Sequence, residues 1–327
     1  MSSILIVGGT GNISFDVALH LRSRGNTVVC LTRGSSLQLE SFLESKGILI
    51  KRYSENFSSL SFDYVIDFVS YSPNDVKKKV HIINTALKAY VFISTTAFYD
   101  RVGFKPPFKE AQSGVDLNWN YAANKLFTEN CLSDMFKSRS PKLFILRLGH
   151  TIGMSLPVYL GNPNQCFIDH IQLGRPVPFL FDISLPWSVG SSTGVSYFLN
   201  SYIDNLYSMP DRLCVHYSGQ ITTWETLISQ SSISLNRRPI SSKCNISDVI
   251  NFTSNWLPSI LYHKRYCDYY DTSLLNDYLG SYPEPSIFNL ILKAAGSKPK
   301  AMSHNHYHLQ LGLLERLSCH NTRQLLT

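Results

Sequence analysis

The sequence predicts an α/β fold, in which helices cover both faces of a doubly wound parallel sheet. Three observations support this prediction: a wholly apolar first strand, a glycine-rich turn directly after it, and an alternation of apolar strands with helical segments along residues 1–153. Parallel strands are buried on both faces, so they appear as continuous apolar runs. A smaller C-terminal lobe is expected to complete the molecule.

A strand at Ile4–Val7 leads into a glycine-rich turn and then into a helix that ends near Gly25. This order is the Rossmann arrangement, in which a helix N-terminus binds the phosphates of a dinucleotide. The turn has Ser14 in place of a third glycine, which predicts a slightly wider fit between helix and strand. The residues that we expect to contact the cofactor in this turn are Gly8, Gly11, Asn12 and Ile13.

The second strand is predicted at Thr27–Thr32, and its end would meet the adenosine ribose of the cofactor. An acidic residue at this point would accept hydrogen bonds from the ribose hydroxyls and select NAD. The residues that follow, Arg33–Ser36, contain no acid but offer a cation and hydroxyls, which suit the 2′-phosphate of NADP. We therefore predict a preference for NADP over NAD, with Arg33 as the phosphate contact.

Two further strands are predicted at 48–50 and 64–69, with only a short serine-rich connection between them. This connection is too short for an ordinary crossover helix, so this half of the sheet is expected to be abbreviated. Ser70 follows the second of these strands and is expected to lie beside the cofactor. A helix is predicted from Pro73 to about Ala89, with Lys77–Lys79 on a solvated face.

Candidate catalytic residues follow the next strand, at Tyr90–Ile93. This strand ends in hydroxyl-bearing residues that include Thr95, and a loop rich in proline and glycine leads to a helix at 120–129. Tyr121 and Lys125 are four residues apart and therefore share one face of that helix. A phenol has a pKa near ~10, and a neighbouring cation would lower it. The set suits proton transfer at an oxygen atom while a nicotinamide cofactor exchanges a hydride with carbon.

The regular alternation fades beyond a sixth strand at 142–147. We therefore assign residues 1–155 to a dinucleotide-binding domain and residues 156–296 to a substrate-binding lobe that is interleaved with the core. Residues 297–327 are polar and are predicted to form a flexible tail. Its His304, His306 and His308 have no cysteine or carboxylate partner nearby, so no metal site is predicted.

The composition excludes several classes of function. The net charge of +7 suits an anionic ligand, but the basic residues are not clustered as in a nucleic-acid binder. The seven cysteines are scattered without a Cys-x-x-Cys pair, which favours reduced residues and a cytoplasmic location. No stretch approaches the ~20 apolar residues of a membrane span, and no signal peptide is expected.

The motifs resemble those of the extended short-chain dehydrogenase/reductases, the NAD-dependent epimerase/dehydratase family. The resemblance covers residues 1–155 and rests on four segments, Gly8–Ile13, Phe92–Tyr99, Tyr121–Lys125 and Arg147–Gly153. It implies a bound NAD or NADP, a sugar or nucleotide-sugar substrate, and a homodimer formed in part by the tyrosine-bearing helix. It also implies that Thr95 is catalytic, that Tyr121 is the acid/base, and that Lys125 binds the nicotinamide ribose and lowers the pKa of Tyr121.

Two departures from the family pattern bear on the reaction. Sugar dehydratases of the family have Asp-Glu directly after the catalytic threonine, whereas Thr96 and Ala97 stand here and cannot act as acid or base. Leu185–Gly194 resembles a family segment with two acids but lacks both, which leaves the substrate open. The sequence therefore favours an epimerase that acts through a transient ketone, with an NADPH-dependent carbonyl reductase of a keto-sugar as the alternative.

An alternative from another class is a non-catalytic member that binds a nucleotide or RNA. The net charge of +7 permits this reading. The complete set of Thr95, Tyr121 and Lys125 argues against it, because a binding module needs no such set. An RNA affinity that falls steeply with salt and survives Tyr121→Phe would favour it.

Overall fold

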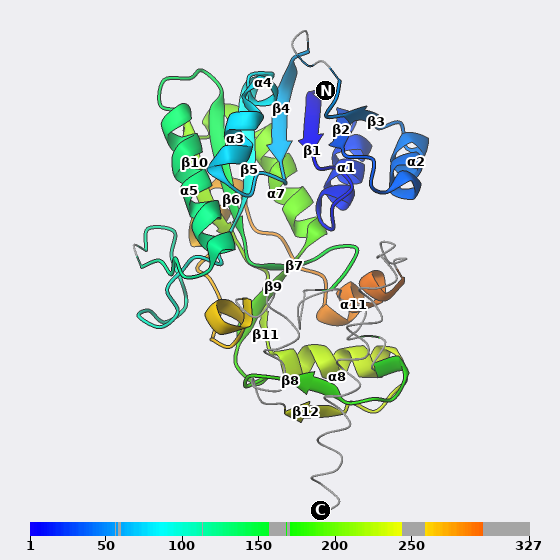
Figure 1. The fold of residues 1–327 in the computed structure, drawn as a ribbon. Helices are drawn as coiled ribbons and strands as arrows, with labels where there is room; N and C mark the ends of the chain where they lie inside the picture. The colour runs from blue at the N-terminus through cyan, green and yellow to red at the C-terminus, as the bar shows by residue number, and fades with distance from the viewer. Residues whose placement is uncertain are drawn as a thin grey trace, which may run out of the picture.

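The main feature of the computed structural model is a parallel sheet of seven strands in the order β10-β6-β5-β4-β1-β2-β3 (Figure 1). The described residues are 1–55, 57, 60–112, 114–156, 168, 171–243 and 259–296. The strands of the sheet are β1 (Ser3–Val7), β2 (Thr27–Thr32), β3 (Leu49–Arg52), β4 (Phe62–Asp67), β5 (Ala86–Thr95), β6 (Lys142–Leu148) and β10 (Arg212–Tyr217). The predicted fold class, a Rossmann-type α/β sheet, is confirmed.

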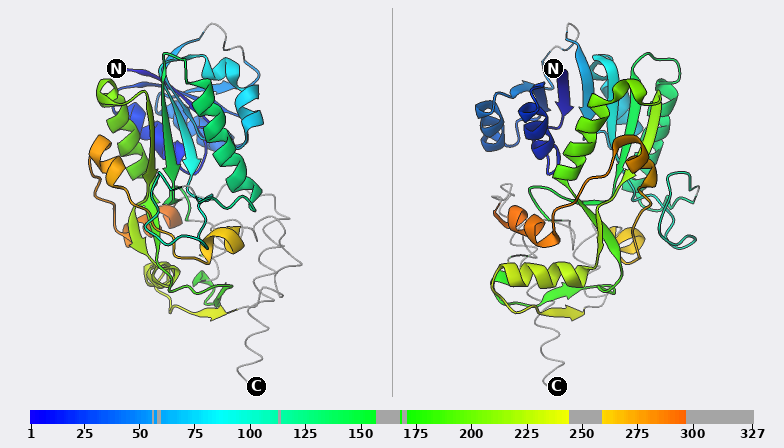
Figure 2. Two further views of the ribbon diagram at one scale, coloured as in Figure 1. Left: turned by 90° about the vertical axis from the view of Figure 1, so that its left-hand side faces the viewer. Right: turned by 180° about the vertical axis from the view of Figure 1, so that it is seen from behind.

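Helices cover both faces of this sheet, as the edge-on view in Figure 2 shows. One face carries α1 (Ser14–Ser23), α2 (Leu37–Ser45) and α7 (Ser192–Asp204), and the other carries α3 (Pro73–Lys78), α4 (Val80–Ile83) and α5 (Asn120–Met135). Successive side chains of β1 point to opposite faces: Ile4 and Ile6 pack with α1 and α7, whereas Leu5 and Val7 join the core under α5. The first strand is therefore buried on both sides, as its apolar run predicted.

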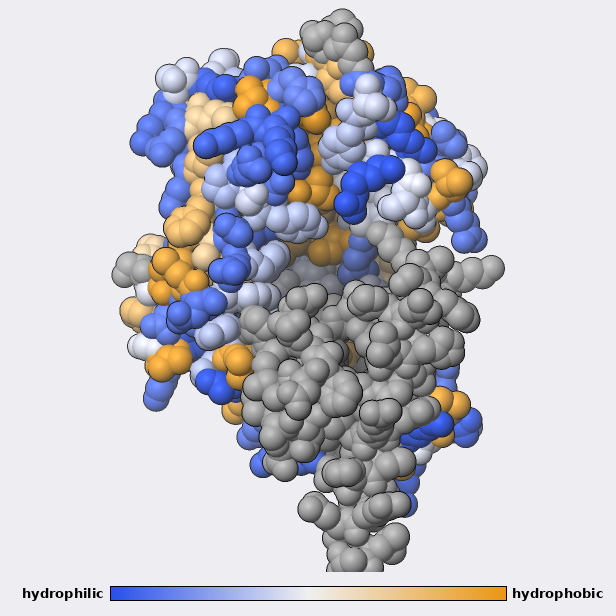
Figure 3. Space-filling model, viewed as in Figure 1, coloured by the Kyte–Doolittle hydropathy of each residue, from blue (hydrophilic) through white to orange (hydrophobic). Residues whose placement is uncertain are grey.

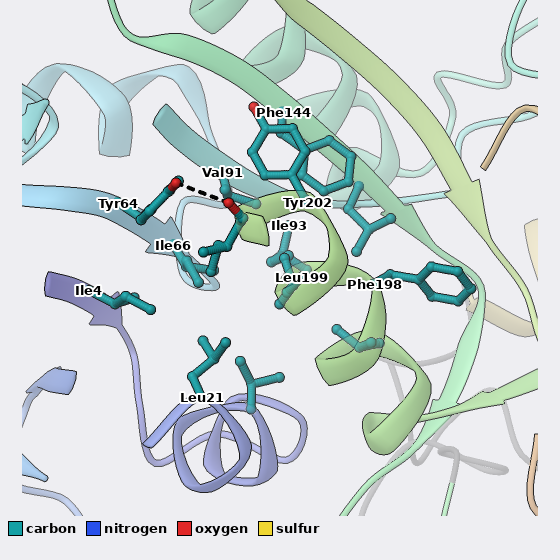
Figure 4. Close-up of a cluster of buried hydrophobic side chains, with 14 of the residues drawn as sticks. Ile4, Leu21, Tyr64, Ile66, Val91, Ile93, Phe144, Phe198, Leu199 and Tyr202 are labelled. Atoms are coloured by element: carbon teal, nitrogen blue, oxygen red, sulfur yellow. Dashed lines mark hydrogen bonds between the residues drawn. The ribbon is translucent and has the colours of Figure 1, made fainter. Parts of the chain in front are cut away.

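Helix α7 and strand β10 return the chain to the central sheet after residue 155. Phe198, Leu199 and Tyr202 of α7 lie over the side chains of β1, β4, β5 and β6 (Figure 4). The ring of Tyr202 stacks on Phe144 with 4.4 Å between centroids, and the Tyr64 hydroxyl donates to the carbonyl of Ile203 over 3.3 Å. The second half of the sequence thus supplies part of the main core.

The remaining elements lie beyond the carboxyl ends of the sheet strands, in the lower half of Figure 1. β7 (His150–Ile152), β9 (Trp187–Ser191) and β11 (Gln220–Thr222) form a three-stranded sheet, and β8 (Val177–Phe179) pairs with β12 (Ser241–Lys243). The helical elements of this half are α8 (Trp224–Ser234), a π-helical turn (Ile260–Lys264) and α11 (Ile287–Gly296). Two short elements lie instead beside the main sheet: a 3-10 turn (Leu206–Ser208) follows α7, and α10 (Ser273–Leu279) packs on α7 and β10.

Two predictions about residues 73–89 are wrong. The helix does not extend to Ala89, because the chain enters β5 at Ala86, where Ala86 and Ala89 pair with Phe62 and Tyr64 of β4. Pairing within the sheet thus overrides the helical propensity of this segment. The predicted solvated face is found for Lys77 and Lys78, which are exposed. It is wrong for Lys79, since this side chain is only 12 % exposed and its ammonium lies 3.6 Å from the Asp67 carboxylate.

Other expectations are met within the described part of the chain. The described residues between β3 and β4 form no helix, as the short connection predicted. Cys30, Cys131, Cys214 and Cys267 are free thiols. None of the described helices is both long and apolar enough to cross a membrane. The predicted tail, with His304, His306 and His308, lies outside the described residues.

The face shown in Figure 3 is mainly hydrophilic where its residues are described, and its apolar side chains form small separate groups. Among the exposed apolar residues of the molecule are Val102 and Phe104 in the loop after β5 and Phe127 on α5. The homodimer implied by the resemblance stays a prediction.

Candidate active site

The glycine-rich turn connects β1 to α1 at the carboxyl edge of the sheet. Gly8 has a φ of +88°, and a Cβ there would lie 2.3 Å from Cγ1 of Val69, so a larger residue does not fit. The Ser14 side chain is folded into the turn, where its hydroxyl donates to the Gly8 carbonyl over 2.6 Å and accepts from the Gly11 N–H over 2.9 Å. Ser14 thus stabilises the turn where a third glycine was expected.

Helix α1 begins from this turn at Ser14 with no side-chain cap on its first N–H groups. Uncapped N–H groups at a helix N-terminus form an anion site, so the turn fits the pyrophosphate of a dinucleotide. Asn12 directs its side chain elsewhere: its Oδ1 accepts from the N–H and from the hydroxyl of Ser155, each over 2.8 Å. Of the residues predicted to contact the cofactor in this turn, Asn12 and Ile13 would therefore contact it through their backbone atoms.

An acidic side chain lies at the end of β2, although the loop that directly follows β2 contains no acid. Glu40, in the first turns of α2, accepts a hydrogen bond from the Thr32 hydroxyl over 2.6 Å and pairs with the Arg52 guanidinium at 2.7 Å. The predicted phosphate contact, Arg33, is exposed on the same loop. The side chains at the place where the adenosine ribose is expected thus come from β2, α2 and β3.

At the end of β4, the buried Asp67 carboxylate closes the turn that contains Ser70. Its oxygens accept from the N–H of Val69 over 2.7 Å, the N–H of Ser70 over 3.0 Å, the Ser70 hydroxyl over 2.5 Å and the Tyr90 hydroxyl over 2.7 Å. Lys79 donates to the Ser70 hydroxyl over 2.9 Å. The side chain of Ser70, predicted to bind the cofactor, is fully buried within this network.

Lys125 projects from α5 to the carboxyl ends of β4 and β5. Its ammonium donates to the carbonyls of Ser70 (2.9 Å) and Ile93 (2.8 Å) and lies 5.0 Å from the ring centre of Tyr71. Burial, which disfavours the charged form, lowers the pKa of Lys125 to about 8. The side chain is thus fixed at the carboxyl edge of the sheet, between the ends of β4 and β5. In the strand order these two strands follow β1, which leads into the glycine-rich turn.

Tyr121 and Thr95 are brought together, one from the start of α5 and the other from the end of β5. The Thr95 hydroxyl lies close enough to the Tyr121 phenol to lower its pKa, and it accepts the Ala97 N–H over 3.2 Å. The Tyr121 ring is flanked by Trp119, with 5.0 Å between centroids. Burial raises the pKa of Tyr121 to about 12, and the nearby Thr95 hydroxyl only partly offsets this. The phenol therefore keeps its proton at neutral pH in the protein alone.

A buried ion pair lies directly behind Thr95 and was not anticipated from the sequence. The Arg101 guanidinium donates to the carbonyl of Thr96 over 3.0 Å and to that of Ala97 over 3.1 Å. It also pairs with Asp268 at 2.7 Å, and each of the two side chains is only 1 % exposed. This pair ties the peptide that follows Thr95 to a segment 167 residues further along the chain.

His150 and His263 complete this buried cluster. His263 shares a hydrogen bond of 2.6 Å with Asp268, and the two imidazole rings stack with 4.6 Å between centroids and 10° between planes. Burial and the adjacent His263 lower the pKa of His150 well below its usual value. Their side chains and that of Asp268 could hold a metal ion by composition and proximity. However, the Asp268 carboxylate is already bonded to Arg101, and parallel rings do not direct their nitrogens to one point. We interpret the cluster as a hydrogen-bonded support.

The predicted site residues thus gather at one edge of the sheet, where the strand order reverses between β1 and β4. Ligands of open α/β sheets bind outside the carboxyl ends of the strands at such a point. A glycine-rich turn, a Thr–Tyr pair and a buried lysine at this edge form the arrangement of the extended short-chain dehydrogenase/reductases.

A comparison with protein-family models confirms this class. Residues 4–182 match the model of the NAD dependent epimerase/dehydratase family, which is more than half of the chain. The chain belongs to that family. A search of curated protein sequences found no match.

Solved structures of UDP-sugar epimerases share the fold. UDP-glucose 4-epimerase from Bifidobacterium longum, in complex with NAD+ and UDP, is 16% identical, with a TM-score of 0.67 over 89% of this chain and 96% of that one. UDP-glucose-4-epimerase from Stenotrophomonas maltophila, with bound NAD and formylated UDP-arabinopyranose, is 14% identical, with a TM-score of 0.71 over 90% and 97%. UDP-glucuronic acid 4-epimerase from Bacillus cereus, with UDP-glucuronic acid and NAD, is 14% identical, with a TM-score of 0.67 over 89% and 97%.

Proposed function

We propose that the protein is an NAD(P)-dependent epimerase of a sugar or sugar nucleotide, acting through a transient ketone. The observation that carries this proposal is the convergence of Thr95, Tyr121 and the buried ammonium of Lys125 at the carboxyl edge of the sheet that also holds the turn at Gly8. The UDP-sugar ligands of two structural neighbours support a sugar-nucleotide substrate. Thr96 and Ala97 offer no acid or base for the elimination of water, so dehydration is not proposed.

Each residue of the site has one role in this reaction. When bound, an oxidised nicotinamide supplies the hydride acceptor and a positive charge that lowers the pKa of the Tyr121 phenol. Tyr121 then removes the proton of a sugar hydroxyl and returns it after the ketone has presented its other face. Thr95 donates to the same oxygen, and Lys125 fixes the cofactor ribose while its charge favours the phenolate.

For the cofactor, we propose NADP rather than NAD. The loop after β2 has no acid of its own, and Arg33 is exposed there. The acid that the fold brings to this place, Glu40, is already bonded to Thr32 and Arg52. Two guanidinium groups near the expected ribose suit a 2′-phosphate. The same feature favours the second candidate function, a carbonyl reductase that consumes NADPH.

Turnover of a sugar-nucleotide panel tests the proposal. The purified protein is incubated without added cofactor with UDP-glucose, UDP-galactose, UDP-glucuronic acid and UDP-xylose, and the anomeric proton signals are followed by NMR. An epimerase converts at least one of them into an equilibrium mixture with no net change in the absorbance of reduced cofactor. Consumption of added NADPH with a keto-sugar, and no interconversion, would instead identify the reductase.

A further inference from the structure

The carboxyl end of β2 contains a compact cluster of three side chains from three different elements. Thr32 is the last residue of β2, Glu40 belongs to α2, and Arg52 is the last residue of β3. Arg52 donates through Nη2 to Oε2 of Glu40 over 2.7 Å and through Nη1 to the Thr32 hydroxyl. Thr32 donates in turn to Oε1 of Glu40 over 2.6 Å. The cluster occupies the place where an acidic residue would receive the ribose hydroxyls of NAD.

The Glu40 carboxylate is not available to a ribose in this arrangement. Glu40 is only 3% exposed, and both its oxygens are hydrogen bonded. Burial alone would raise the pKa of Glu40, but the hydrogen bonds from Arg52 and Thr32 outweigh it, and the pKa is lowered. Glu40 therefore stays an anion whose charge is covered by Arg52.

Arg52, in contrast, remains accessible. Its side chain is 37% exposed and passes over Gly34, where a Cβ would lie 3.6 Å from Nε. Gly34 has a φ of +81°, so the loop keeps this place free of a side chain. The guanidinium is thus fixed by two partners on one side and open on the other.

We propose that Arg52 determines the choice between the two nicotinamide dinucleotides, by receiving the 2′-phosphate of NADP and by covering the Glu40 carboxylate that would otherwise repel it. This inference rests on the proposed function, because it assumes a dinucleotide on the turn at Gly8. A guanidinium binds phosphate with two parallel N–H donors. Without Arg52, the uncovered Glu40 becomes an acid at the end of β2, which accepts from the hydroxyls of NAD. Removal of one cation thus reverses the preference.

In the experiment, the purified protein is unfolded to release any bound dinucleotide and refolded, and binding of NADP+, NAD+, 2′,5′-ADP and 5′-AMP is then measured by calorimetry, without turnover. In Arg52→Ala, the affinity for NADP+ and 2′,5′-ADP is expected to fall by about 10- to 100-fold, the range of a lost charge-assisted hydrogen bond. The affinity for NAD+ and 5′-AMP stays equal or rises. Adding Glu40→Gln to Arg52→Ala removes the repelling charge and restores part of the NADP+ affinity.

Two further variants define the controls. Lys51 precedes Arg52 on β3 and pairs with the exposed Glu55 at 2.6 Å, so Lys51→Ala is expected to leave the ratio of the two affinities unchanged. Arg52→Lys keeps the charge and loses the planar fork, so it gives an intermediate ratio and serves if Arg52→Ala does not fold.

An equal loss of NADP+ and NAD+ affinity in Arg52→Ala and in Arg52→Lys would overturn the inference and leave the proposed function intact. So would a change of preference in Arg33→Ala that Arg52→Ala does not show. A wild-type protein that binds 5′-AMP and 2′,5′-ADP equally well would also overturn it. If neither dinucleotide binds the wild-type protein, the proposed function fails together with this inference.

Discussion

Replacing Tyr121 by phenylalanine is expected to lower kcat by roughly 10²- to 10⁴-fold, the usual contribution of a general acid–base. The substitution removes only the phenolic hydroxyl and keeps the ring beside Trp119 and Tyr71. Binding of the dinucleotide should therefore change little. The measurement is kcat on the sugar nucleotide found active, together with a calorimetric titration of the cofactor.

Tyr207→Phe is the matched control, because Tyr207 is 92% exposed and lies in the turn after α7. This substitution removes a phenolic hydroxyl far from the carboxyl edge of the sheet and should leave kcat unchanged. If Tyr121→Phe retained the wild-type kcat, the assignment of Tyr121 as the acid/base would be wrong.

Asp268→Asn is expected to lower the free energy of unfolding by about 3–5 kcal/mol, because it leaves the Arg101 guanidinium as an uncompensated buried charge. The Arg101 guanidinium and the hydrogen bond with His263 hold the pKa of Asp268 far below its usual value even though burial opposes this. Asp268 is therefore ionised throughout the range in which the protein is assayed. Urea unfolding of the wild-type protein and of the variant measures the difference.

A double variant separates the ion pair from the loss of packing. Arg101→Met combined with Asp268→Asn removes both charges, so it should be less destabilised than the sum of the two single variants. Lys137→Ala is the control, because Lys137 and Asp134 form an ion pair whose side chains are 65% and 70% exposed. It should change the stability by less than about 1 kcal/mol. A similarly small effect of Asp268→Asn would show that the buried pair does not support the site.

Local sequence patterns predicted most of the first six strands, and they indicated the candidate site residues at the strand ends and on α5. The apolar run Ile4–Val7, the turn at Gly8 and the four-residue spacing of Tyr121 and Lys125 each depend on short segments, so a single sequence displays them. Thr95 could be placed beside Tyr121 because both lie at the carboxyl edge of one sheet, from β5 and α5. Here the order of strands and helices along the chain is enough to bring the two residues together.

Contacts between distant segments could not be predicted in the same way. Arg101 and Asp268 are 167 residues apart, and nothing in either segment indicates the other. Glu40 is only eight residues from Thr32. It becomes the acid at the end of β2 because α2 folds back onto that strand, so a search limited to Arg33–Ser36 missed it. The sequence signal that could have revealed Glu40 is an acidic residue in the first turns of the helix that follows β2.

The second half of the sheet illustrates the same limit. β10 joins β6 in parallel register, with Arg212 opposite Leu143 and Tyr217 opposite Leu148, after the chain has formed β7 and β9 of the three-stranded sheet. The apolar pattern at 212–217 is short and does not say which sheet the strand will join. Residues Ala86–Ala89 show the opposite effect. Their sequence favours a helix, but pairing with β4 makes them part of β5.

The identity and retention of the cofactor test the central claim most directly. The purified protein is analysed by absorbance and native mass spectrometry before and after mild denaturation. An epimerase uses its cofactor within each turnover, so the account predicts about one NADP or NAD per chain, released only when the protein unfolds. A protein that carries no dinucleotide and takes up neither NADP(H) nor NAD(H) would contradict the account and favour a non-catalytic member of the family.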